Sequence, residues 1–114
     1  MDSKELAIAC MKAADDRKAE DIIALDVKEL TSVADYFVIC TGTSAPHLRA
    51  ILNEIEMQLK EQDIRPISED GIAGTNWVAL DYNTVIVHVM QPDARKKYEL
   101  VRYWGDAPRL LLQI

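Results

Sequence analysis

Apolar residues recur every three or four positions in three stretches of the chain, and this spacing predicts three amphipathic helices. The first covers about residues 3–17. The second, about residues 46–62, has the most regular apolar stripe and can be capped by the hydroxyl side chains just before it. The third covers about residues 92–104, where the following Gly105 is expected to end it.

Short apolar runs between these stretches predict buried strands at residues 22–25 and 36–41, because β-branched and aromatic residues are enriched in them. Residues 64–67 are expected to form an edge strand, since Pro66 cannot donate a hydrogen bond to a ladder. Residues 70–74, with two glycines, are expected to form a loop.

Residues 77–82 and 85–90 form two alternating runs separated by Asn83-Thr84, a pattern that predicts a tight β-hairpin. Because side chains alternate across a strand, one face would carry Val78, Leu80, Tyr82, Val85, Val87 and Val89, and we expect it to face the core. The other face would pair Trp77 with Met90, Ala79 with His88, and Asp81 with Ile86.

This second hairpin face mixes large apolar side chains with a carboxylate and an imidazole. If a helix covers it, Asp81 and His88 need polar partners there. If it is open, Trp77 and its neighbours form an apolar patch of the kind that marks an interaction site. The pattern leaves both alternatives open.

The order of elements favours an α/β fold: one domain spanning residues 1–114, with a mixed β-sheet of about five strands and flanking helices. The pattern does not indicate where residues 109–114 pack. No apolar run approaches the length of a membrane span, and the N-terminus is unlike a secretory signal, so we expect a cytoplasmic protein. Cys10 and Cys40 lie among apolar residues and are expected to be buried free thiols, although a disulfide is not excluded.

The formal net charge of −6 and the sequence pI near 4.8 argue against a broad nucleic-acid-binding surface. They favour a partner with a basic surface. Basic and aromatic residues do alternate in the last predicted helix: Arg95, Lys96, Lys97, Tyr98, Arg102, Tyr103 and Trp104. We interpret this as a packed stripe with a solvated charged face rather than an RNA contact.

Gly42-Thr43-Ser44 lies between a predicted strand and the N-terminus of a predicted helix, a place where backbone N–H groups can bind phosphate. It lacks the spacing of a Walker loop or of a dinucleotide-binding turn. A helix cap is the favoured interpretation. His47 and His88 share no metal-binding or acid–base motif, so neither a metal site nor a cofactor is predicted.

A strand, a Gly-Ser turn and a helix also resemble the opening of the nucleotidyltransferase fold. Enzymes of that fold follow the turn with paired carboxylates that hold divalent metal. Here the matching region is Ile64-Arg65-Pro66-Ile67, and a later strand has Val87-His88-Val89 where a third carboxylate would stand. Without those oxygens a Mg²⁺ ion has too few ligands. The sequence therefore predicts a nucleotidyltransferase-like fold without the catalytic carboxylates.

Together, four blocks in order across roughly residues 5–107 resemble the ribosomal silencing factor (Iojap-related) family. They are residues 21–26, residues 34–44 with His47, residues 76–82 followed by 85–90, and Arg95, Tyr98, Trp104 and Asp106. The resemblance implies a non-enzymatic translation repressor. Members bind large-subunit ribosomal protein fourteen and sterically block joining of the small subunit, with no cofactor.

The same resemblance implies which side chains would face the ribosomal protein. Trp77, Asp81, His88, Arg95 and Tyr98 stand at family-typical positions, and Glu69 and Asp70 are added because a ribosomal partner is expected to be basic. The chain departs from the usual pattern at Asn83, Thr84 and Val101. Two alternatives remain: a nucleotidyltransferase-like enzyme, and a homodimeric adaptor that uses the same patch on itself, either instead of ribosome binding or only when free.

Overall fold

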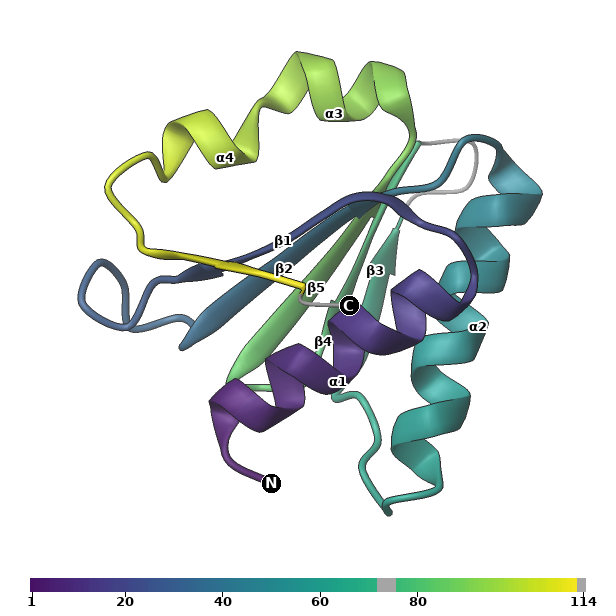
Figure 1. The fold of residues 1–114 in the computed structure, drawn as a ribbon, viewed down its shortest axis with the longest axis horizontal. Coiled ribbons are helices and arrows are strands. Elements are labelled where there is room, and N and C mark those ends of the chain that lie inside the picture. Colours follow the sequence, from purple (N-terminus) through teal and green to yellow (C-terminus); the bar gives the residue numbers. More distant parts are fainter. Residues whose placement is uncertain (72–75, 113–114) are drawn as a thin grey trace.

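The computed structural model describes residues 1–71 and 76–112. Its helices and strands follow one another along the chain as shown in Figure 1: α1 (Ser3–Asp16), β1 (Glu20–Asp26), β2 (Tyr36–Thr41), α2 (Ala45–Lys60), β3 (Ser68–Gly71), β4 (Trp77–Asp81), β5 (Val85–Met90), α3 (Pro92–Tyr98), α4 (Leu100–Tyr103) and β6 (Arg109–Leu111).

The strands form one sheet in the order β3-β4-β5-β2-β1-β6. β2 and β5 are parallel and the other neighbouring pairs are antiparallel, so the sheet is mixed, as predicted. Helices α1 and α2 cover one face, whereas α3 and α4 lie over the other (Figure 1). The predicted α/β fold is confirmed, with six strands where about five were expected.

The main core lies between the sheet and helices α1 and α2. The predicted apolar face of the hairpin belongs to it, and the predicted cross-strand register is confirmed from Val78 opposite Val89 to Asp81 opposite Ile86. The turn has Asn83 at φ 74°, a left-handed conformation that asparagine tolerates well. Both cysteines are buried free thiols, as predicted, and desolvation raises the pKa of each to about 12.

A second, smaller core lies under α3 and α4. Its buried residues include Phe37, Ile39 and Met90, and Trp77, Ile86, Leu100, Val101 and Trp104 pack against it. The mixed face of the hairpin is thus covered at Met90, which has no exposed surface, and only partly covered at Trp77. Val101, a departure from the usual family pattern, packs inward.

Two predictions for the edge of the sheet are wrong. The edge strand is Ser68–Gly71 and not residues 64–67, and Asp70 and Gly71 are paired residues of that strand and not loop residues. Residues 72–74 of the expected loop lie outside the described residues. The main-chain pairing from Ser68 opposite Asp81 to Gly71 opposite Val78 needs no apolar side chains, and for that reason a hydrophobic pattern did not reveal it.

The predicted continuous last helix is also wrong. Glu99 has a left-handed conformation with φ 43°, and it separates α3 from the short helix α4. After α4, the apolar tail forms β6, which pairs antiparallel with β1 from Arg109 opposite Leu25 to Leu111 opposite Ile23. This strand returns the chain to the far edge of the sheet (Figure 1).

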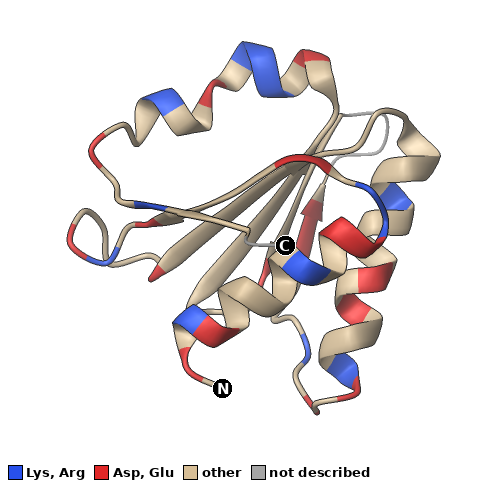
Figure 2. Cartoon of the chain, in the orientation of Figure 1, with Lys and Arg blue, Asp and Glu red and all other residues tan. Residues whose placement is uncertain are grey.

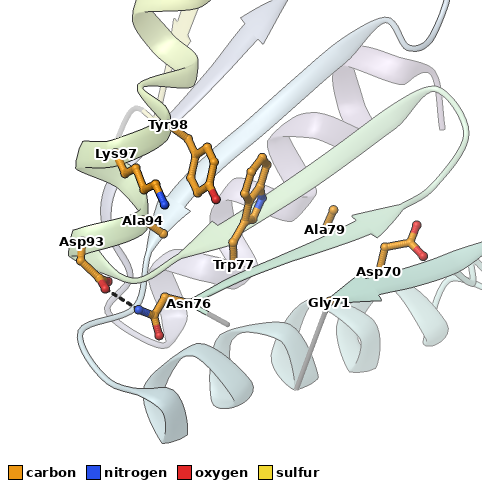
Figure 3. Close-up of a pocket in the computed structure, with 9 residues that line it drawn as sticks. All are labelled: Asp70, Gly71, Asn76, Trp77, Ala79, Asp93, Ala94, Lys97 and Tyr98. Carbon is orange, nitrogen blue, oxygen red and sulfur yellow. Dashed lines mark hydrogen bonds between the residues drawn. The ribbon is translucent and has the colours of Figure 1, made fainter. Parts of the chain in front are cut away.

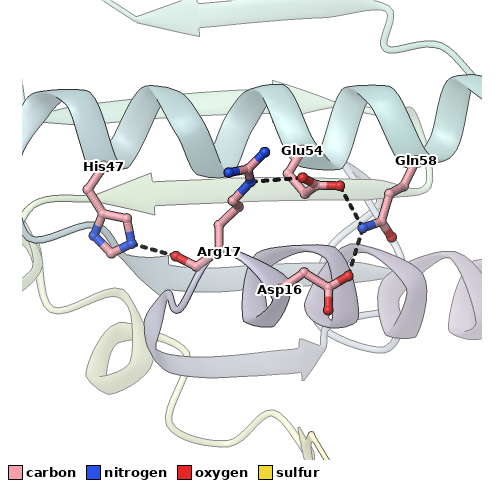
Figure 4. Close-up of polar contacts among 5 residues, drawn as sticks. All are labelled: Asp16, Arg17, His47, Glu54 and Gln58. Atoms are coloured by element: carbon pink, nitrogen blue, oxygen red, sulfur yellow. Dashed lines mark hydrogen bonds and ion pairs between the residues drawn. The ribbon is translucent and has the colours of Figure 1, made fainter.

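A polar cluster ties α1 to α2 (Figure 4). The Arg17 guanidinium donates to the Glu54 carboxylate at 2.8 Å, and the Gln58 amide donates to both Glu54 and Asp16 at 2.8 Å. The hydrogen bonds from Gln58 and Arg17 lower the pKa of Glu54. His47 completes the cluster, because its Nε2 lies 2.7 Å from the Arg17 carbonyl oxygen.

Helix α2 begins with the predicted cap. The Ser44 hydroxyl accepts a hydrogen bond from the His47 backbone N–H at 3.2 Å, and the Thr43 backbone N–H donates to His47 Nδ1 at 2.9 Å. Gly42 N–H donates to the Met90 carbonyl at 3.0 Å. The N–H groups of Gly42 and Thr43 are therefore already bonded within the chain, which supports a cap rather than a phosphate-binding turn.

Replacing Ser44 with alanine is expected to lower the free energy of unfolding by about 1 kcal/mol, because the orphan N–H at the start of α2 loses its acceptor. Denaturant unfolding followed by circular dichroism measures the change. Ser44→Asp is the matched control, since a carboxylate also caps a helix, and it should retain wild-type stability. Equal losses in both variants would contradict the capping role.

Candidate functional site

A groove of about 590 Å³ lies on the open part of the second sheet face, between β4 and α3 (Figure 3). Two aromatic side chains, Trp77 and Tyr98, stand together in it with ring centroids 4.7 Å apart. Tyr98 is 48% exposed and Trp77 is half-buried beneath it. The remaining lining residues are Asp70, Gly71, Asn76, Ala79, Asp93, Ala94 and Lys97.

The local sequence brings these two rings together. Trp77 points to this face because residues alternate along β4, and Tyr98 ends α3 because Glu99 leaves the helical conformation. The start of α3 is held to the start of β4, since the Asn76 side-chain amide donates to the Asp93 carboxylate (Figure 3). The Gln91 N–H also donates to the Asn76 carbonyl at 2.6 Å.

Below the groove, His88 on β5 contacts Trp77. The indole Nε1–H donates to His88 Nδ1 at 3.1 Å, and the Phe37 and His88 rings form a T-shaped pair at a centroid distance of 5.5 Å. Burial lowers the pKa of His88 to about 4. The imidazole is therefore neutral at pH 7 and able to accept this hydrogen bond.

Two carboxylates, Asp70 and Asp93, line the groove that holds the two rings. Asp70 lies opposite Ala79 in the sheet and shares its face, and Asp93 lies at the other end of the groove. The Lys97 ammonium lies 5.4 Å from the Tyr98 ring centroid and is the one basic group among the described residues that line the groove. Asp81 stands on the same sheet face and its carboxylate accepts from the Asn83 N–H at 2.7 Å. The groove is acidic on balance.

Two residues expected at the site lie elsewhere. Arg95 donates to the Thr41 hydroxyl at 2.8 Å and to the Asp21 carbonyl at 2.9 Å, so it fastens α3 to the ends of β1 and β2. Burial lowers its pKa. Glu69 points to the opposite sheet face, where it forms an ion pair with Arg49 of α2 at 3.0 Å.

Of the seven residues expected to face the partner, five therefore lie in the groove or on its sheet face, and two lie elsewhere. Trp77, Tyr98 and Asp70 line the groove, and Asp81 and His88 share its sheet face.

Asp93 also lines the groove but was not among the residues expected from the sequence. Its place one helical turn before Lys97 could have indicated that both belong to one surface. The last predicted helix was expected to have a solvated charged face and a packed stripe. The charged face is confirmed, because Lys96, Lys97 and Arg102 are exposed. In the stripe, Trp104 packs inward, whereas Tyr98 is exposed.

Among residues 1–71 and 76–112, no three or more His, Cys, Asp or Glu side chains come together in a way that could hold a metal ion. Over the same described ranges, no helix has the length and apolar character needed to cross a bilayer. What distinguishes the sheet face around β4 is an aromatic, acidic groove, and such surfaces bind partners in proteins of many folds.

Comparison with known proteins defines the family. All of residues 1–114 match the model of the family described as ribosomal silencing factor during starvation. The ribosomal silencing factor of Bacillus subtilis is 42% identical over 108 residues, covering 95% of this chain and 92% of that protein. The mouse protein named for mitochondrial assembly of the ribosomal large subunit is 32% identical, over 75% of this chain and 39% of its own length.

A solved structure agrees with the sequence relatives. A crystal structure of a Chromobacterium violaceum protein superposes with a TM-score of 0.87 at 31% identity, covering all of this chain and 94% of that one. The chain is thus a small α/β protein with a mixed six-stranded sheet. It belongs to the ribosomal silencing factor family, which is not a known family of enzymes.

Proposed function

We propose that this protein represses translation by binding the large ribosomal subunit through ribosomal protein fourteen, with the groove between β4 and α3 as its docking surface. The observation that carries the proposal is the ring pair in the groove, in which Trp77 is half-buried and Tyr98 is exposed. Tryptophan and tyrosine supply much of the binding energy where proteins meet. The family membership and the name of the mouse relative support the ribosomal partner.

Charge supports the choice of a basic partner. The chain carries a net charge of −6, and carboxylates flank the two rings at Asp70 and Asp93. Figure 2 shows acidic residues on α1, α2 and β3, whereas α3, which forms one wall of the groove, carries basic residues as well. The preference for a basic partner therefore rests on the net charge and on the two carboxylates that line the groove. An acidic protein surface raises the rate of encounter with a basic one, because opposite potentials steer the two together.

The proposed mechanism is steric. A bound domain of this size occupies the surface that the small subunit would need, so repression requires neither turnover nor a cofactor, and the protein would act in the cytoplasm. The enzyme alternative is not favoured by the turn at residues 42–44, where the Gly42 and Thr43 N–H groups are bonded within the chain.

Subunit joining tests the proposal. Purified large and small subunits, mixed at a Mg²⁺ concentration that permits joining, are separated in sucrose gradients with and without saturating protein. We expect the joined peak to fall and the protein to migrate with the large subunit. An unchanged joined peak at saturation would contradict the proposal.

The same surface could pair with a second copy when the protein is free. Sizing the protein alone and with isolated ribosomal protein fourteen distinguishes these partners. If a dimer forms through the groove, Tyr98→Ala should make the free protein monomeric and also weaken the ribosomal complex, because both contacts would use one aromatic surface. A dimer that persists in this variant would place self-association elsewhere.

A further inference from the structure

We infer that His88 is a positioning residue of the docking surface: it fixes the Trp77 indole through their hydrogen bond and does not itself contact the partner. This inference rests on the proposed function, because it concerns how the same groove is prepared for binding. It differs from the expectation drawn from sequence, in which His88 faces the ribosomal protein.

The geometry places His88 behind Trp77. In the antiparallel pairing of β4 and β5, Trp77 lies opposite Met90 and Ala79 lies opposite His88, so the two rings are diagonal neighbours on one sheet face. Their centroids lie 5.7 Å apart, and Trp77 Nε1 is 3.1 Å from His88 Nδ1. The imidazole also forms a T-shaped pair with the Phe37 ring.

A row of rings thus crosses the sheet from its covered part to its open part. Trp104 packs on Phe37 at a centroid distance of 5.4 Å, Phe37 packs on His88, His88 bonds to Trp77, and Trp77 packs on Tyr98. Among these five rings Tyr98 is the most exposed, and at the opposite end Trp104 also contacts the exposed Tyr103 ring at a centroid distance of 5.3 Å. The packed rings at one end therefore support the orientation of the rings at the groove.

The hydrogen bond between these two side chains can form in only one direction, with the indole as donor and the imidazole as acceptor. An indole N–H can only donate, and His88 Nδ1 can accept only while it carries no proton. In a variant without that acceptor, the hydrogen bond that helps to hold the indole beside Tyr98 is lost. A side chain that is already held in its binding orientation loses less conformational entropy when the partner docks.

A double-mutant cycle tests this role. His88→Leu, Trp77→Phe and the double variant are titrated against isolated large subunits, with circular dichroism and unfolding temperatures confirming that each is folded. We expect His88→Leu to bind about five- to tenfold more weakly than the wild type. In the Trp77→Phe background, which has no indole N–H, the same change should alter affinity by less than about twofold.

Fully additive losses would overturn the inference and leave the proposed function standing, because they would mean that His88 binds the partner independently of Trp77. If Trp77→Phe and His88→Leu both bind as tightly as the wild type, the docking surface lies elsewhere. That result would overturn both the proposed position of the docking surface and the role inferred for His88. The two failures are therefore distinguishable.

Rescue and spectroscopy give a second measurement without the partner. His88→Asn keeps an acceptor oxygen near the position of Nδ1, so we expect it to restore most of the binding lost in His88→Leu. In ¹H–¹⁵N spectra, the indole signal assigned to Trp77 should shift in His88→Leu and stay near its wild-type position in His88→Asn. An indole signal that does not move in His88→Leu would overturn the inference whatever the binding result.

Discussion

Replacing Trp77 with alanine is expected to weaken binding to the large ribosomal subunit by about 2 kcal/mol or more, which is roughly a thirtyfold increase in Kd. The indole is the largest side chain lining the groove and supports the exposed Tyr98 ring. The variant therefore loses the anchor itself and also the surface against which Tyr98 is held. Titration of the purified subunit with labelled protein measures the change.

Tyr103→Ala is the matched control for this experiment. Tyr103 is an aromatic residue at the end of α4, 79% exposed and not among the residues that line the groove. Tyr103 contacts Trp104 at the end of the ring row that is farthest from the groove, and Phe37 and His88 still hold Trp77 without it. Its removal should therefore leave affinity unchanged if the groove is the docking surface. Wild-type affinity in Trp77→Ala, with the domain still folded by circular dichroism, would show that the partner binds elsewhere.

The parts of the fold that follow from local pattern were predictable from sequence. Helix α2 has a clean apolar stripe after a serine cap, and the hairpin has two alternating runs and a two-residue turn that together fix its register. In both cases the information lies within about twenty residues of chain. The core face of the hairpin follows directly from that register.

The missed features depend on partners that are distant in sequence. Strand β6 exists because Leu110 and its neighbours pair with β1, some eighty residues earlier in the chain. Strand β3 reads Ser-Glu-Asp-Gly, a polar sequence with no strand signal of its own, and it is held by hydrogen bonds to β4. The left-handed Glu99 also gave no signal, since a glutamate rarely takes that conformation.

At the candidate site, too, the sequence predicted what local pattern determines and missed what contacts between distant segments determine. Alternation along β4 placed Trp77 and Asp81 on one face, and the register of the hairpin added His88 of β5 to it. Sequence could not show that Tyr98 would close over Trp77, because that contact requires the break between α3 and α4. The sequence also could not show that the Arg95 guanidinium is hydrogen-bonded to the Thr41 hydroxyl and the Asp21 carbonyl, since those groups lie at the ends of distant strands.

Acid is expected to destabilise the folded protein through His88. Burial lowers the pKa of this imidazole from 6.5 to about 4. Between these two values the unfolded chain binds a proton at His88 and the folded protein does not, so the free energy of unfolding falls as the pH drops. The loss begins near pH 6.5 and is complete near pH 4, below which both states carry the proton.

The full difference in pKa corresponds to about 3 kcal/mol, and partial exposure of the ring reduces the expected loss to about 2 kcal/mol. Denaturant unfolding at a series of pH values from 7 to 4 measures it. Carboxylates also titrate at the lower end of this range, Glu54 among them, and its lowered pKa removes stability only as the pH falls below its ordinary value.

His88→Asn separates the imidazole from these carboxylates, because it keeps an acceptor for the Trp77 N–H but cannot take up a proton in this range. The variant should lose about 2 kcal/mol less than the wild type between pH 7 and pH 4, whatever its stability at pH 7. Parallel stability curves for the two proteins would mean that His88 titrates equally in the folded and unfolded chain. In that case the imidazole would not be desolvated behind Trp77, and the neutral acceptor that orients the indole would lose its physical basis.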